Sequence, residues 1–134
     1  MSTIGIDGQP HMTSVWALRD GDSLLAWTYR KGQKVRNLER DPRATLMIET
    51  GDTYQQVRGA SLECDVELID DLEQKLLIGA RISAKFAGVT PGNPSTDSEG
   101  VPELIRKQAS KRIVLVFTPR RIRTWDHRKL APPQ

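Results

Sequence analysis

The densest group of cationic side chains follows an apolar segment and precedes a short segment that we expect to be helical. Residues 23–28 have the pattern of a strand, and Asp41-Pro42 marks the end of the helical segment. Four cations lie within seven residues between these two features: Arg30, Lys31, Lys34 and Arg36. Unpaired backbone N–H groups in a first helical turn favour an anion, and lysine or arginine beside them strengthens the binding. The pattern is typical of a phosphate-binding turn, although charged turns are also common on ordinary protein surfaces.

Other side chains with chemical potential do not form a known catalytic or metal-binding motif. His11 and His127 have no cysteine or carboxylate at the spacing of a zinc site. No Gly-x-Ser-x-Gly segment presents a serine nucleophile. We therefore predict no metal site, assign no catalytic residue, and expect His127 to hold the C-terminal turn through hydrogen bonds with Asp126. Cys64 is the single cysteine, which predicts a buried free thiol and, with no signal peptide, a cytoplasmic protein.

Length and composition indicate one small domain with a modest positive charge. The chain has 134 residues, a net charge of +3 and 37% hydrophobic residues. A domain of this size buries about two thirds of its unfolded surface, and the lean apolar content predicts that a partner subunit covers more. No apolar run approaches the roughly 20 residues of a membrane span, and the diffuse charge does not favour nucleic acid. We expect one domain over residues 1–134, a frayed tail at residues 131–134, and neither a membrane nor a nucleic acid as partner.

Turn signals and hydrophobic alternation predict a mainly β, antiparallel fold with flanking helices. Strands are expected over residues 3–6, 11–18, 23–28, 43–50, 55–69, 111–118 and 121–125. Asp-Gly pairs at residues 7–8 and 20–21 predict that the first three strands form a meander. In the fifth strand the apolar alternation changes phase near Leu62-Glu63, which predicts a bulge that bends the sheet. Helices are expected over residues 71–87 and 102–110, on either side of a surface loop at residues 91–100. These elements favour a split antiparallel β-barrel over a parallel sheet, which needs a helix between almost every pair of strands.

Four stretches of the chain, taken in order, carry a family resemblance. They are residues 7–16, Lys34–Leu38 with Asp41–Arg43, residues 57–59 and residues 124–130. Together they resemble the flavin-binding split barrels of the pyridoxamine 5'-phosphate oxidase-like family, and most of all its small branch that binds FMN or the deazaflavin coenzyme F420. With apolar residues on both faces of its strands, the resemblance implies a homodimer that holds its cofactors at the subunit interface.

The resemblance also implies which residues bind the cofactor. In this family the second strand lies along the flavin ring, the end of the third contacts the ribityl chain and phosphate, and an Arg-Lys pair holds the phosphate. Lys34 matches the lysine, whereas Gln33 stands where the family has arginine, so Lys31 or Arg36 is expected to supply the missing charge. The implied cofactor-binding residues are Met12, Thr13, Ser14, Val15, Trp16, Ala17, Trp27, Thr28, Lys31, Gln33, Lys34, Arg36, Asn37 and Arg58. Trp16 and Trp27 can equally be core residues, and Arg58 can equally form an ion pair.

The resemblance favours a cofactor-dependent oxidoreductase that transfers a hydride to an electron-poor small molecule. Because the cofactor carries the chemistry, such an enzyme needs no acid–base or nucleophile motif of its own. Coenzyme F420 is favoured because a spread of cations suits its polyanionic tail, and FMN is the alternative. A non-catalytic barrel that holds FMN, deazaflavin or haem is the rival hypothesis. An FMN-dependent oxidase of pyridoxamine 5'-phosphate is not expected, since that activity needs further C-terminal contacts and this sequence ends soon after Leu130.

Overall fold

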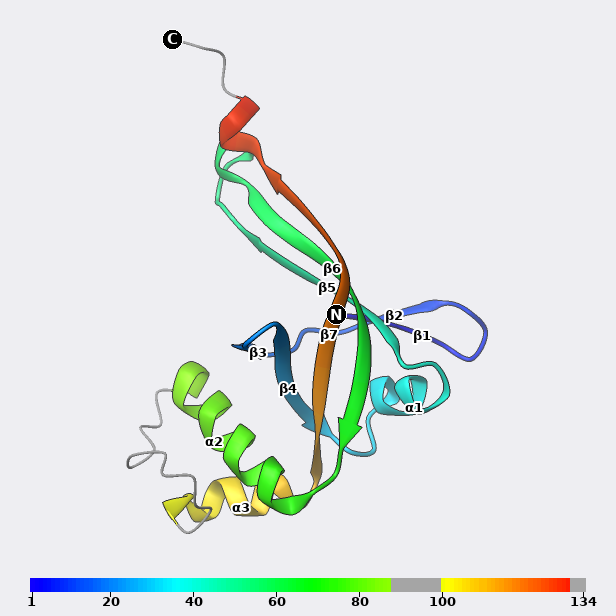
Figure 1. Cartoon of the computed structure of the whole chain (residues 1–134), viewed down its shortest axis with the longest axis vertical. Helices are drawn as coiled ribbons and strands as arrows, with labels where there is room; N and C mark the ends of the chain where they lie inside the picture. Colours follow the sequence, from blue (N-terminus) through cyan, green and yellow to red (C-terminus); the bar gives the residue numbers. More distant parts are fainter. Residues whose placement is uncertain (88–99, 131–134) are drawn as a thin grey trace.

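The computed structural model describes residues 1–87 and 100–130, which form one antiparallel sheet flanked by helices (Figure 1). The strands are β1 (Ser2–Ile4), β2 (Pro10–Met12), β3 (Ala17–Asp20), β4 (Ser23–Tyr29), β5 (Arg43–Thr50), β6 (Arg58–Ile69) and β7 (Arg112–Asp126). The helices are α1 (Gln33–Arg40), α2 (Leu72–Ala87) and α3 (Glu103–Ala109), and short 3-10 turns span Tyr54–Gln56 and His127–Leu130. The strand order is β2-β1-β5-β6-β7-β4-β3. The prediction of a mainly β, split antiparallel barrel with flanking helices is confirmed.

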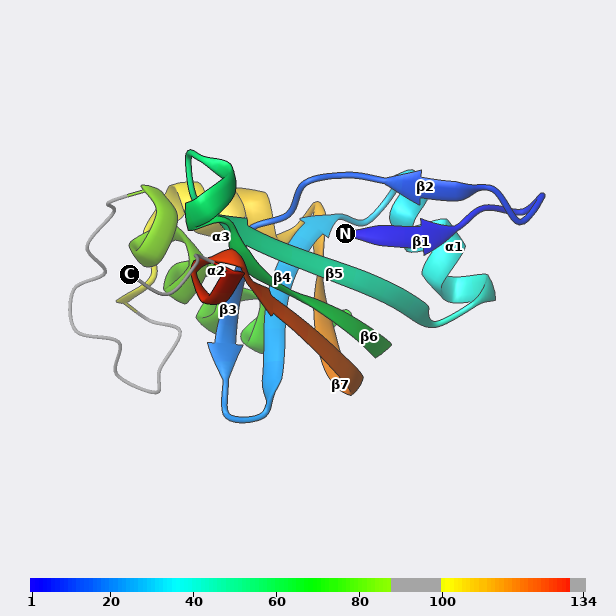
Figure 2. The same cartoon turned by 90° about the horizontal axis from the view of Figure 1, so that it is seen from above.

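The first strands do not form the predicted meander. β1–β2 and β3–β4 are separate hairpins at opposite edges of the sheet, and residues 13–16 carry the chain from one edge to the other (Figure 2). Gly8 and Gly21 have φ angles of 81° and 60° in the two turns, which only glycine adopts without strain, so the local turn signals were correct. The single strand predicted over residues 11–18 is wrong because residues 13–16, named here the crossing segment, lie between the two edges and belong to no ladder.

β6 and β7 are the long strands about which the sheet bends. Glu63 faces Arg121 and Cys64 faces Pro119, so Arg120 is an extra residue on β7. The bulge predicted near Leu62-Glu63 is therefore confirmed as a register shift, with the extra residue on the neighbouring strand. The two strands predicted over residues 111–118 and 121–125 are one, because Pro119 sits at this irregularity, where a missing N–H is tolerated.

Apolar clusters lie on both sides of the sheet. One fills the barrel interior under α1 and contains the fully buried Val35, Leu115 and Phe117. The other lies between the sheet and the helices α2 and α3, where Trp27 packs closely against α2. A Cβ atom at Gly79 would lie 2.4 Å from Cζ3 of Trp27, so glycine is required for this approach. This contact explains the small-residue face predicted for the helix at residues 71–87.

The remaining expectations about elements are mostly met within the described residues. The helix predicted over residues 102–110 is present as α3, whereas residues 91–99 of the predicted loop and the predicted tail at residues 131–134 lie outside those residues. Cys64 is buried, and this burial raises the pKa of its thiol to about 11. His127 does hold the C-terminal turn, but its Nδ1 lies 2.9 Å from the carbonyl oxygen of Tyr54 rather than at Asp126. None of the described helices is long and apolar enough to cross a bilayer.

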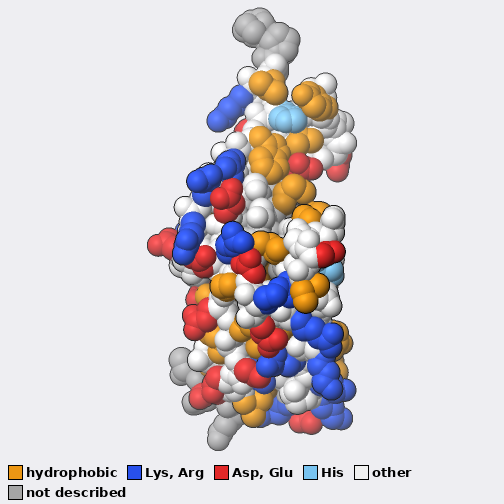
Figure 3. Space-filling model, turned by 90° about the vertical axis from the view of Figure 1, so that its right-hand side faces the viewer, with side chains coloured by type: hydrophobic (Ala, Val, Ile, Leu, Met, Phe, Trp, Pro, Cys, Tyr) orange, Lys and Arg blue, Asp and Glu red, His pale blue; other side chains and the backbone are white. Residues whose placement is uncertain are grey.

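The outer parts of β5, β6 and β7 project from the barrel as a three-stranded arm (Figure 1). We define the arm as residues 47–50, 58–63 and 121–126. Trp125 covers Gly59 on one face, where a Cβ atom would lie 2.6 Å from Cζ2 of the indole. Met47, Ile48 and Ile122 are more than half exposed, and hydrophobic side chains gather over this part of the molecule (Figure 3). The arm therefore presents apolar surface that the barrel itself does not cover.

Candidate functional site

A cavity of about 650 Å³ opens where the ladder between β3 and β4 ends. The last pair of that ladder is Ala17 with Ala26. Beyond it, residues 14–16 of the crossing segment and residues 27–29 of β4 line the same cavity, with α2, α3 and the start of β7 as its other walls. Residues 27–29 pair with β7 on one side only, so their other edge has no ladder partner. An open strand edge offers N–H and C=O groups that can bind the polar rim of a planar ligand.

Lys34 stands beside this cavity as a cation with no carboxylate partner. Its Nζ donates a hydrogen bond to Oγ1 of Thr28, a cavity residue, at 3.2 Å. Burial, and after it the charge of Arg112, lower the pKa of Lys34. Among the described residues, no carboxylate forms an ion pair with Lys34 or with Arg112. Two neighbouring cations without a counter-charge favour an anionic ligand.

Three side-chain atoms of the described residues are buried without a hydrogen-bond partner, and one of them belongs to the cavity residue Arg112. Oγ1 of Thr13 and Nε of Arg112 are both buried without a hydrogen-bond partner, and so is Nδ1 of His11. A buried polar atom left without a partner costs about 1–3 kcal/mol, so such atoms are uncommon in native structures. A hydroxyl, an ammonium and a guanidinium are the groups that bind phosphate oxygens in proteins. The residues present therefore fit the phosphate group of a flavin-type cofactor.

Helix α1 begins at Gln33, and its N-cap residue is Gly32, which has no side chain to cap the helix. The side chains of Gln33 and Asn37 are used inside the protein. Nε2 of Gln33 donates to Oδ1 of Asn37 at 2.9 Å, and Nδ2 of Asn37 donates to Oγ1 of Thr3 at 3.0 Å. Asn37 is fully buried, so this chain of hydrogen bonds ties α1 to β1.

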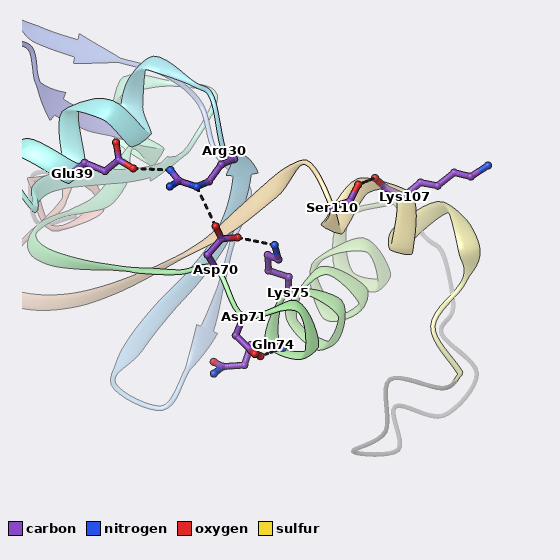
Figure 4. A network of polar contacts seen from close by, with 8 residues as sticks. All are labelled: Arg30, Glu39, Asp70, Asp71, Gln74, Lys75, Lys107 and Ser110. Atoms are coloured by element: carbon purple, nitrogen blue, oxygen red, sulfur yellow. Dashed lines mark hydrogen bonds and ion pairs between the residues drawn. The ribbon is translucent and has the colours of Figure 1, made fainter.

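Arg30, the first cation of the basic turn, is also occupied. Its guanidinium binds Glu39 at 2.6 Å and Asp70 at 3.2 Å, and Asp70 in turn binds Lys75 at 2.7 Å (Figure 4). This network joins the ends of α1 and β6 to the first turns of α2. Lys31 and Arg36 are exposed, and no ion pair within the described residues involves either of them.

The structure brings about half of the expected cofactor residues together. Ser14, Val15, Trp16, Trp27 and Thr28 line the cavity, with Lys34 bound to Thr28. Trp16 also stacks on Phe86 of α2 at 5.4 Å between ring centroids. Trp27 belongs both to the cavity wall and to the core, and its role in cofactor binding stays a prediction.

The other expected residues do not line the cavity. Met12 is exposed in β2 and Ala17 opens β3, while Arg58 lies on the arm beside a different depression that contains Thr50 and Lys129. Sequence reasoning missed Arg112, whose only sequence signal is an arginine at the start of a β-branched segment. No group of three or more metal-ligating side chains lies together in residues 1–87 and 100–130.

The strand order and the flanking helices define a split-barrel protein, and the comparisons identify its family. The model of the pyridoxamine 5'-phosphate oxidase family matches residues 1–126, and the chain belongs to the pyridoxamine 5'-phosphate oxidase-like split barrels. This family binds flavins or deazaflavins and includes oxidoreductases.

The solved structures show the same relationship. A conserved hypothetical protein from Mycobacterium tuberculosis, Rv2991, is 36% identical over 99% of this chain and 79% of its own, with a TM-score of 0.82. A protein described as an F420 reductase is 20% identical over 91% of this chain and 85% of its own, with a TM-score of 0.65. The haem storage protein HutZ from Vibrio cholerae is 12% identical over 91% of this chain and 81% of its own, with a TM-score of 0.67. The last two likenesses show the fold alone. No curated protein matches the sequence.

Proposed function

We propose that this protein is an oxidoreductase that binds coenzyme F420, with FMN as the alternative, in the cavity beside β4. The observation that carries the proposal is Lys34, a half-buried cation without a carboxylate partner that is hydrogen-bonded to the cavity residue Thr28. The phosphate of the cofactor binds at Lys34 and Thr13, and its ring binds along the open edge of β4 and the crossing segment. The substrate is an electron-poor small molecule.

The residues of the chain position the reactants, whereas the bound cofactor supplies the hydride chemistry. Trp16 and Trp27 line the cavity with large flat side chains, and Ile82 and Ile105 line it with apolar ones. This apolar lining keeps water away from the reactants. The described lining residues include no carboxylate and no histidine. The hydroxyls of Ser14, Thr28, Tyr29 and Ser83 are the described lining hydroxyls that can relay a proton.

The proposed active form is a homodimer in which the arm covers the partner subunit. Met47, Ile48 and Ile122 expose apolar surface of the kind that a second copy can bury. Arg58 lies on the arm and not at the cavity of its own chain, so it can serve a cofactor only by reaching the cavity of the partner. A free, buried Cys64 is in keeping with the cytoplasmic location that we propose.

The second candidate is a barrel that holds a flavin, deazaflavin or haem without catalysis. The lack of a carboxylate or histidine among the described lining residues favours it over an enzyme that needs its own acid or base. The same observation argues against haem, because neither His11 nor His127 lines the cavity and a histidine is the usual haem ligand.

Separate fluorescence titrations of the purified protein with FMN and with F420 test the proposal. We expect sub-micromolar binding of F420, with affinity that rises with the length of the glutamate tail at low salt. Raising the salt shortens the Debye length from about 10 Å at 0.1 M to about 3 Å at 1 M, which should weaken the tail contacts. Tight binding of FMN alone, with no effect of tail length, would mean that the cofactor is FMN and not F420. Binding of neither would overturn it.

A further inference from the structure

We propose that Arg112 takes the place of the arginine that the phosphate site lacks at position 33, so that Lys34 and Arg112 form a two-element clamp for one phosphate group. The clamp rests on the proposed cofactor site and adds to it a binding residue that the motif at residues 33–34 does not contain. Lys34 comes from α1, whereas Arg112 comes from the start of β7.

Lys34 and Arg112 approach the open edge of β4 from opposite faces of the sheet, because neighbouring positions of a strand face opposite sides. Thr28, which accepts the hydrogen bond from Lys34, pairs with Ile113 in the β4–β7 ladder. The next pair along the same ladder is Tyr29 with Arg112. Thr28 and Arg112 both line the cavity. Burial lowers the pKa of Lys34, and the charge of Arg112 lowers it further.

Packing against two aromatic rings holds the Arg112 guanidinium in place but leaves its Nε–H donor without a hydrogen bond. Its Cζ atom lies 4.7 Å from the ring centroid of Trp27 and 4.5 Å from that of Tyr29. Stacking on two aromatic rings orients the planar guanidinium group before a ligand binds, which lowers the entropy cost of binding. Its Nε, however, has no acceptor. By contrast, seven other arginines of the described residues pair with carboxylates: Arg30, Arg43, Arg81, Arg120, Arg121, Arg123 and Arg128.

The contacts of Gln33 explain why the charge comes from another element. Gln33 donates to the buried Asn37, which binds Thr3 of β1, so position 33 takes part in holding α1 against the barrel. A guanidinium on β7 restores the charge and the planar donor set that this position lacks, because arginine alone presents a fork that matches two phosphate oxygens. The ligand chemistry is therefore a phosphate group, from the cofactor or from free phosphate.

The first test measures dissociation constants for FMN and F420 by fluorescence titration of four variants. Arg112→Gln should weaken the cofactor that the parent binds by roughly 10- to 150-fold. The cofactor affinity of Arg112→Lys should lie between those of the parent and Arg112→Gln, since lysine keeps the charge but lacks the planar guanidinium group. Gln33→Arg combined with Arg112→Gln should recover most of the lost affinity. Arg19→Gln is the matched control, because Arg19 is exposed and folds back onto the carbonyl of Gly21. Thermal unfolding of each variant reports whether the fold is kept.

The second test follows the Nε–H resonance of Arg112 by NMR, identified by its loss in Arg112→Lys, while inorganic phosphate is added. The resonance should shift, and Lys34→Ala should require a several-fold higher phosphate concentration for the same shift. A shift of equal size with chloride, or one unaffected by Lys34→Ala, would overturn the clamp. If the parent binds neither cofactor while phosphate still moves this resonance through Lys34, the proposed function fails and the clamp stands. If Arg112→Gln folds and binds the cofactor as tightly as the parent, the clamp fails and the proposed function stands.

Discussion

The cavity beside β4 and the arm both expose large hydrophobic side chains, yet their charged groups are arranged in opposite ways. At the cavity, Lys34 and Arg112 have no carboxylate partner among the described residues, and Nε of Arg112 has no acceptor. On the arm, Arg123 pairs with Glu63, and Arg128 pairs with Asp126 at 2.6 Å. Arg128 lowers the pKa of Asp126 to about 2, as expected for a carboxylate whose charge is matched.

This difference indicates what each region binds. A buried polar atom without a partner is destabilising, so a cavity that contains such atoms fits a polar ligand that satisfies them. A surface on which Glu63 and Asp126 are paired with arginines, and on which apolar side chains such as Ile48 and Ile122 remain exposed, fits another protein surface. We therefore assign small-molecule binding to the cavity and subunit contact to the arm, as proposals that the following experiments can separate.

The largest effect is expected from a charge placed on the arm. Ile122→Glu should weaken dimerisation by about 1,000-fold, because a buried isoleucine contributes roughly 1.5–3 kcal/mol, twofold symmetry counts it twice, and the glutamate charge must also lose its water. Light scattering at micromolar concentration should show a dimer for the parent and a monomer for the variant. Leu72→Glu, at an exposed leucine in the first turn of α2, is the control. A parent that is monomeric with cofactor bound would refute the assignment of the arm.

The next effect in size is expected at the cavity. Lys34→Ala removes a charge-assisted hydrogen bond to the phosphate, worth about 1.5–3 kcal/mol, so cofactor affinity should fall by roughly 10- to 150-fold. Fluorescence titration measures this, and circular dichroism should show an intact fold. Lys107→Ala on α3 is the control, since Lys107 is exposed and does not line the cavity. If Lys34→Ala binds the cofactor as tightly as the parent, Lys34 does not contribute to cofactor binding.

A smaller effect is expected from pH. The pKa of Lys34 lies below its ordinary value of 10.5 because the side chain is buried and because Arg112 is near. Only the protonated lysine attracts phosphate, so affinity should fall as pH rises through this lowered pKa, by at most about tenfold per pH unit. In the protein without ligand, folding stability depends on pH in the opposite direction. Between the lowered pKa and 10.5 the unfolded chain binds more protons at Lys34 than the folded chain does, so the free energy of unfolding increases with pH.

Titrations of cofactor at several alkaline pH values measure the expected fall. Lys34→Arg keeps its charge throughout this range and should bind with nearly constant affinity. A parent whose affinity is as constant as that of Lys34→Arg would show that protonation of Lys34 does not contribute to binding.

The smallest effect is expected from the exposed cations. Lys31→Ala and Arg36→Ala should each weaken F420 by less than about fivefold, because exposed charge pairs are worth about 0.2–1 kcal/mol. The effect should disappear at about 1 M salt, where screening is strong. A loss as large as that of Lys34→Ala, persisting at high salt, would mean that Lys31 or Arg36 and not Arg112 supplies the second phosphate charge.

Short-range patterns predicted most elements, but not how distant ones meet. The Asp-Gly turns, the bulge near Glu63 and the helix at residues 72–87 all depend on neighbouring residues, and all are present. The meander failed because a hairpin signal says nothing about which edge of a sheet the hairpin joins. The sequence predicted Lys34 as a phosphate-binding residue, which stays a prediction, but it could not foresee that Gln33 and Asn37 bind each other.

The sequence by itself determined the strand-to-helix turn that carries Lys34, the family to which the chain belongs and the buried state of Cys64. These features follow from turn chemistry, hydrophobic alternation and motif order, which act over a few residues. Only the tertiary structure decided that Arg112 lines the same cavity as Thr28, the partner of Lys34. It also decided that Arg58 lies on an arm away from the cavity, and that Arg30 is held by Glu39 and Asp70. Those arrangements depend on the pairing of β4 with β7 and on burial across the whole sheet, which local preferences do not encode.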